Sequence, residues 1–186
     1  MRFLARFVTP YLERTALLAS VRSLARSVGV DARNPKWTSY GALEIDLFAP
    51  TKADLDIFLS LMDPLAELEF VHDLNLAPTH KADEELLSEA RQLFNEERYW
   101  ECHEVLEGLW RQKQGNEKRF LQGVILVCAA FVHHQKGEGD VALSVLARSS
   151  RQLDFPESAY GGFPVAPLRK NVEAILASKR FSNFRV

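Results

Sequence analysis

The chain has 186 residues, of which 47% are hydrophobic and 26% charged, and its formal net charge at pH 7 is −2. These values are typical of a folded soluble protein and exclude a disordered chain. The nearly balanced charge gives the chain no overall attraction for nucleic acid or for an anionic membrane.

The two cysteines, Cys102 and Cys128, both lie in apolar stretches that are expected to be helical. Two thiols cannot build a disulfide framework, so we expect free, buried thiols in a reducing compartment. Charged residues interrupt the first 14 positions, which therefore lack the apolar core of a secretion signal. The longest apolar run, 120–132, is too short to span a bilayer. We predict a cytoplasmic protein without a membrane anchor.

The first part of the chain alternates between strand-like and helix-like patterns. Strands are predicted over 2–8, 30–40, 43–47 and 70–76, the second of them interrupted by Asn34-Pro35. Thr9-Pro10 is expected to open a helix that ends at Gly29, and Thr51 a helix that runs to Met62. The order β-α-β-β-α-β predicts an α+β fold whose N-terminal domain, residues 1–78, is a ferredoxin-like sandwich. This topology occurs with many functions, so it identifies none.

Ala77-Pro78-Thr79 is the expected domain boundary, because the hydrophobic period changes there from two to 3.6. Helices are predicted over 81–95, 98–112, 117–136, 140–153 and 165–178, with a Pro/Gly loop over 154–164 and a basic-aromatic tail. The short connections predict that residues 79–186 form an all-α antiparallel bundle of about five helices.

The stretch YWECHEVLEGLWR, residues 99–111, separates its side chains into two arcs when about 100° is allowed per residue. The polar arc holds Trp100, His103, Glu104, Glu107, Trp110 and Arg111. The apolar arc holds Cys102, Val105, Leu106 and Leu109. A solvated face does not need two tryptophans, so we expect the polar arc to meet another part of the protein or a ligand.

The helix predicted over 117–136 is apolar almost all the way round and should be the central one. Its polar exceptions share a narrow stripe: Lys118, Gln122 and His133. A short turn near Gly115 makes this helix an antiparallel neighbour of the previous one, with position n opposite roughly 229 − n. Glu107 is then level with Gln122, and Arg111 with Lys118.

In this register a buried Glu107 carboxylate finds donors on Gln122, Lys118 and Arg111. One interpretation is a satisfied polar layer that only fixes the register of the two helices. The other is a polar pocket between helices 98–112 and 117–136, with Trp100 and Trp110 as its aromatic walls. We predict a non-catalytic binding or interaction module whose pocket accepts a small polar or anionic molecule.

The sequence His-Glu-x-x-Glu resembles the HExxH zinc helix, with Glu107 in place of the second histidine. His103 and Glu107 would be an i, i+4 ligand pair, but a third protein ligand is missing locally. His133 lies about 10 Å further along the helices, at 1.5 Å per residue. A divalent metal held by His103 and Glu107 is therefore possible but is not the favoured interpretation. A metal-assisted hydrolase with Glu104 as general base is the alternative, and RNA binding by the arginines of the first helix and the tail is the second alternative.

Two stretches, FNEERYWECHEVLEGLWR and KRFLQGVILVCAAFVHHQKG, together resemble the signature of domain of unknown function family 309. The resemblance covers roughly 85–176. It implies an all-helical domain and no particular activity. Its signature positions correspond to Tyr99, Glu101, His103, Glu104, Glu107, Trp110, Gln122 and His133.

Overall fold

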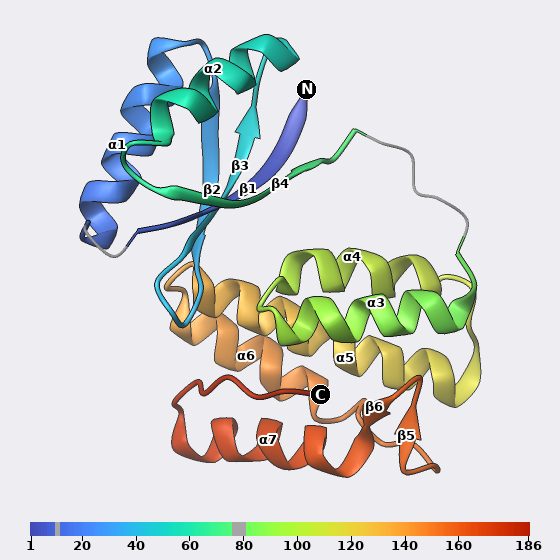
Figure 1. Cartoon of the computed structure of the whole chain (residues 1–186). Helices are drawn as coiled ribbons and strands as arrows, with labels where there is room; N and C mark the ends of the chain where they lie inside the picture. Colours follow the sequence, from blue (N-terminus) through green and yellow to red (C-terminus); the bar gives the residue numbers. More distant parts are fainter. Residues whose placement is uncertain (10–11, 76–80) are drawn as a thin grey trace. The chain divides into compact units, whose positions relative to one another are not determined.

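A computed structural model describes residues 1–9, 12–75 and 81–186 of the chain. The chain divides into two compact units, Met1–Thr79 and His80–Val186, and each is described by itself (Figure 1). The predicted boundary at Ala77-Pro78-Thr79 lies outside the described residues. No helix within these described ranges has the length and apolar character needed to cross a bilayer.

The first unit has the element order β1-α1-β2-β3-α2-β4 (Figure 1). The elements are β1 Arg2–Val8, α1 Arg14–Ser27, β2 Asp31–Trp37, β3 Leu43–Phe48, α2 Lys52–Met62 and β4 Glu67–Asp73. The strands form one antiparallel sheet in the order β2-β3-β1-β4. Phe3, Ala5 and Phe7 of β1 share a buried core with residues of both helices. The α+β class predicted from the sequence is therefore confirmed.

Two predicted element boundaries in this unit are wrong. Helix α1 begins at Arg14 with Glu13 as its N-cap residue, so Thr9-Pro10 does not open it. Strand β4 runs over Glu67–Asp73 and not over 70–76, and Leu76 lies outside the described residues. Both errors concern the ends of elements, where local sequence signals compete with the packing of the whole unit.

Strand β2 forms although Asn34-Pro35 interrupts its pattern. The pairing of β2 with β3 shifts register between Arg33 and Lys36, so the interruption lies in a bulge. Asn34 adopts a left-handed φ of 52°, which asparagine tolerates better than most residues. Proline lacks a backbone N–H, and a bulge on an edge strand is a position where that donor is not needed.

The second unit contains five helices within residues 81–186, α3 to α7 (Figure 1). They are α3 Asp83–Asn95, α4 Tyr99–Trp110, α5 Gly115–Gln135, α6 Gly139–Ser149 and α7 Val165–Ser178. The predicted loop 154–164 contains a short hairpin, β5 Ala159–Tyr160 and β6 Phe163–Pro164, which the sequence analysis missed. Gly161 and Gly162 turn it with φ values of 53° and 82°, and two positive φ values are typical of a type I′ hairpin turn.

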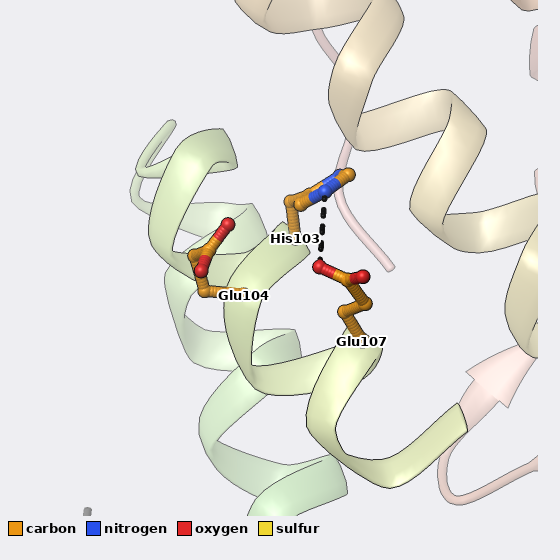
Figure 2. Close-up of side chains that lie close together, drawn as sticks. All are labelled: His103, Glu104 and Glu107. Carbon is orange, nitrogen blue, oxygen red and sulfur yellow. Dashed lines mark ion pairs between the residues drawn. The ribbon is translucent and has the colours of Figure 1, made fainter. Parts of the chain in front are cut away.

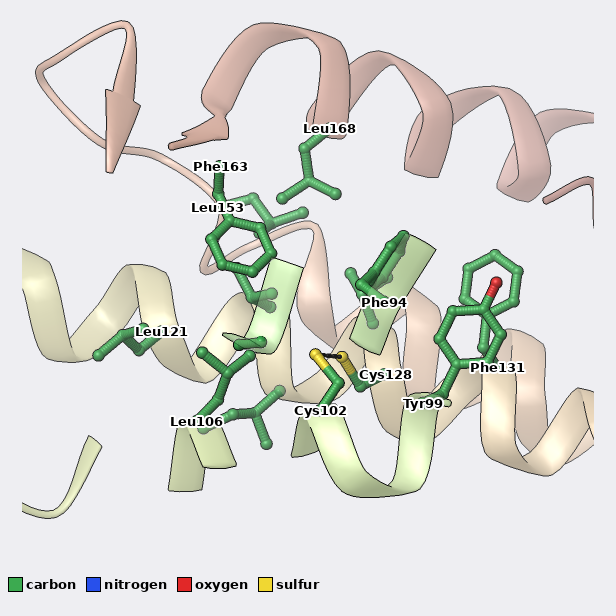
Figure 3. Close-up of a cluster of buried hydrophobic side chains, with 14 of the residues drawn as sticks. Phe94, Tyr99, Cys102, Leu106, Leu121, Cys128, Phe131, Leu153, Phe163 and Leu168 are labelled. Atoms are coloured by element: carbon green, nitrogen blue, oxygen red, sulfur yellow. Dashed lines mark hydrogen bonds between the residues drawn. The ribbon is translucent and has the colours of Figure 1, made fainter. Parts of the chain in front are cut away.

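The antiparallel register predicted for α4 and α5 is confirmed by three contacts. The Tyr99 and Phe131 rings stack with centroids 4.6 Å apart. The Cys128 thiol donates a hydrogen bond to the Cys102 sulfur at 3.3 Å (Figure 3). The Lys118 Nζ lies 4.3 Å from the centroid of the Trp110 ring. Each pair agrees with the expected register to within one residue.

The sulfur contact lies in the apolar core that α4 and α5 share (Figure 3). Both cysteines are free and fully buried. Burial raises the pKa of the Cys102 thiol well above its ordinary value, and the neighbouring Cys128 sulfur adds to this effect. Cys102 therefore stays protonated and is unsuited to act as a nucleophile.

Candidate metal site on helix α4

Helix α4 presents one apolar face to the core and one polar face away from it. The buried residues of α4 are Tyr99, Cys102, Leu106 and Leu109. Three of these four are residues of the predicted apolar arc, and Tyr99 completes the same stripe at helical spacing. The division of this helix into two arcs is therefore confirmed, and the polar side chains of interest lie on the face away from the core.

The polar side chains of α4 contact one another along the helix. The Trp100 ring stacks on the His103 ring, with centroids 5.7 Å apart and an interplanar angle of 7°. His103 Nε2 lies 3.8 Å from Glu107 Oε2. Arg111 Nη2 donates to Glu107 Oε1 at 3.0 Å. These spacings of three and four residues place successive side chains on one face of a helix.

Of the three donors predicted for Glu107 in a polar layer, Arg111 is confirmed, and the two on α5, Gln122 and Lys118, are wrong. The donors to Glu107 come from its own helix, and the amino group of Lys118 lies over the Trp110 ring instead. The residue Gln122 is half-buried, and its side chain makes no hydrogen bond to any part of the chain that the structure describes. The Glu107 side chain is 35% exposed, so it extends along the rim of α4 and not into the helix interface.

His133 belongs to a different part of the molecule. It lies in the last turn of α5, where its Nδ1 contacts Glu138 Oε2 at 2.5 Å. This hydrogen bond lowers the pKa of the Glu138 carboxyl. Near this end of α5, Gln135 donates to the backbone oxygen of Glu97, which precedes the first turn of α4. His133 is therefore separated from His103 along the helix pair, as the register predicts.

His103, Glu104 and Glu107 form a cluster that could hold a metal ion (Figure 2). Each offers one ligand atom, and these atoms all lie within 4.8 Å of one another. Ligands of one ion with bonds of about 2.0–2.2 Å must be roughly 3–4 Å apart. His103 and Glu107 are already within this range, with their ligand atoms 3.8 Å apart, and Glu104 lies beside this pair (Figure 2). Glu104 is thus a candidate for the third group that sequence reasoning found missing locally.

Two ring nitrogens on the same face of α4 are buried without hydrogen-bond partners among the described residues: His103 Nδ1 and Trp110 Nε1. The residues are seven apart, which is close to two helical turns. A buried donor or acceptor left unsatisfied costs about 1–3 kcal/mol. Neither nitrogen is the His103 Nε2 atom that faces Glu107, so this cost is separate from the cluster.

The part of the chain that contains the cluster matches a known protein family. Residues 87–145 match the family model described as domain of unknown function DUF309. This chain carries a DUF309 domain. The match begins in α3 and ends in α6, so it is shorter than the 85–176 resemblance seen in the sequence, and it includes α4 and α5 completely.

A crystal structure of a conserved hypothetical protein from Thermus thermophilus is similar to this chain. The two are 32% identical over 48% of this chain and 94% of that one, with a TM-score of 0.43. Among curated proteins, none matches the chain with significance. The DUF309 assignment thus identifies a domain and leaves its chemistry to the residues themselves.

Proposed function

We propose that the DUF309 domain of this chain is a binding module that holds one divalent metal ion through His103, Glu104 and Glu107. The observation that supports the proposal is the convergence of one nitrogen and two oxygen donors within 4.8 Å. Imidazole and carboxylate ligands suit zinc and manganese. Three protein ligands leave coordination positions open, and a small polar or anionic molecule could bind there with Arg111 nearby.

The charges of the cluster favour a cation. Two carboxylates within reach of each other repel, and Arg111 pairs with only one of them, Glu107. Glu104 is exposed and has no ion-pair partner in the described ranges of the chain. A bound cation would offset both negative charges. The His103 ring makes no hydrogen bond to the described chain, so its Nε2 is available to a metal.

The geometry of the cluster gives less support to the two alternatives, a metal-assisted hydrolase and an RNA-binding protein. A Glu104 that binds the ion cannot also act as the general base of a hydrolase, so binding is favoured over hydrolysis. RNA binding gains nothing from this site, because its central groups are carboxylates that repel phosphates.

Dialysis against zinc or manganese, followed by elemental analysis, should find one ion per chain. Glu104→Gln should weaken zinc binding by about 10-fold or more, a loss typical of groups that orient or bind a metal. Glu89→Gln on α3 is the matched control, because Glu89 pairs with Lys81 outside the cluster. Failure to take up an ion, or equal affinity of the Glu104→Gln variant and the unaltered protein, would refute the proposal.

For the first unit we propose a ferredoxin-like sandwich, which is supported by its β-α-β-β-α-β order and by the strand order β2-β3-β1-β4. We also propose a cytoplasmic location for the protein. It is supported by Cys102 and Cys128, whose neighbouring free thiols suit a reducing compartment.

A further inference from the structure

A hollow of about 440 Å³ lies on the helical unit, away from the polar face of α4. Its lining residues come from helix α3, the residue after it and the C-terminal tail: Ser88, Arg91, Gln92, Asn95, Glu96 and Arg185. The tail is held beside it by the Asn95 side chain, which exchanges two hydrogen bonds with the Val186 backbone at 3.0 and 2.9 Å. The hollow is therefore bordered by α3 and by the tail.

Arg91 lines this hollow, and its guanidinium lies against the β5–β6 turn at Gly162. A Cβ atom at Gly162 would lie 2.5 Å from Arg91 Nη1 and 2.9 Å from Arg91 Cζ. Gly162 has a φ of 82°, a left-handed conformation that favours glycine. The turn therefore packs directly on the guanidinium and restricts its movement.

Arg91 is half-buried and has no acceptor for its donors among the described residues. Its Nε is buried without a hydrogen-bond partner. In the described ranges, neither Arg91 nor Arg185 forms an ion pair or a side-chain hydrogen bond. A partly desolvated guanidinium without an acceptor is unfavourable, and its planar set of donors matches a carboxylate or phosphate in a bidentate arrangement.

Glu96 is the acidic residue that lines the hollow, and it does not serve as an acceptor for Arg91. The Glu96 carboxylate accepts hydrogen bonds from Gln92 at 2.8 Å and from Arg98 at 3.0 Å. Arg98 is shared between Glu96 and Glu101. Among the residues that line the hollow, the two arginines still outnumber the one carboxylate. Ser88 adds a hydroxyl group of the kind that fixes the orientation of a bound anion.

We propose that Arg91 and Arg185 form a second ligand site of the helical unit, which binds a small anion through a phosphate or carboxylate group. Arg91 is the fixed bidentate donor, and Arg185 closes over the ligand from the tail. The site uses residues of α3 and the tail and does not depend on a metal at His103.

The test is a titration of EDTA-treated full-length protein with inorganic phosphate and, in a parallel series, with acetate, followed by amide NMR shifts. EDTA removes any metal, so a response cannot arise at the His103 cluster. Saturable shifts around Ser88, Arg91 and Asn95 are expected with one or both anions, and the series that binds more tightly identifies the group. Arg91→Gln should weaken binding at least 10-fold.

Arg91→Lys keeps the charge and loses the bidentate geometry, so it should weaken binding less than Arg91→Gln but measurably. Arg148→Gln on α6 is the control for net charge and should bind as the unaltered protein does. Shifts that are spread over the surface, or that persist in Arg91→Gln, would overturn the proposal. So would the absence of saturable shifts with both anions in a protein whose spectrum shows it folded.

Discussion

Replacing His103 by alanine is expected to weaken zinc binding by at least about 100-fold. His103 supplies the only nitrogen donor of the three-ligand cluster, and even groups that merely orient a ligand contribute about 10- to 100-fold to metal affinity. Competition with a chelator of known zinc affinity measures the change. Because His103 is on the rim of α4 and is 22% exposed, the variant should keep its helical circular dichroism.

His133→Ala is the matched control for this experiment. It also removes an imidazole from the helical unit, but one that pairs with Glu138 at the far end of α5. Zinc affinity should be unchanged in this variant. Equal losses in the two variants would mean that zinc binds histidines without regard to the cluster, and a loss in His133→Ala alone would move the site to the end of α5.

Phe131→Ala should lower the free energy of unfolding of the helical unit by about 3–5 kcal/mol, the range for removing a buried aromatic ring. Phe131 is fully buried. Its ring lies 4.6 Å from Tyr99, 5.3 Å from Phe181 and 5.7 Å from Phe184 by centroid distance. The substitution thus leaves a cavity where α4, α5 and the tail meet. Urea unfolding followed by far-ultraviolet circular dichroism measures the loss.

Val141→Ala on α6 serves as the comparison for that measurement, because Val141 is 46% exposed. Its effect should stay within about 0.5 kcal/mol, as for most surface substitutions. A loss of less than about 1 kcal/mol in Phe131→Ala would show that the tail and the two helices do not form a single packed core.

The sequence was sufficient to predict how α4 and α5 pack. Burial imposes a strict period, so Cys102, Leu106 and Leu109 identify the inward face. A short connection at Gly115 then leaves one antiparallel register, which the Cys102–Cys128 contact confirms. The spacing of apolar residues along a helix is enough to identify its buried face, and two buried faces joined by a short turn must pack on each other.

The polar contacts could not be predicted in the same way. The register of two helices predicts which residues lie opposite each other. A glutamate at the edge of a helix can still contact either the opposite helix or the next turn of its own helix. Glu107 pairs with Arg111 of its own helix and not with Gln122. For the same reason the sequence missed Glu104 as the third member of the cluster. The Arg91 hollow was also missed, because it depends on a glycine turn distant in sequence that packs on α3.

An anomalous difference map from a zinc-loaded crystal, collected at the zinc absorption edge, tests the central claim most directly. A single strong peak is predicted about 2.0–2.2 Å from His103 Nε2 and from carboxylate oxygens of Glu104 and Glu107. A fully loaded crystal with no peak on this face of α4, or with its peak between His133 and Glu138, would contradict the account.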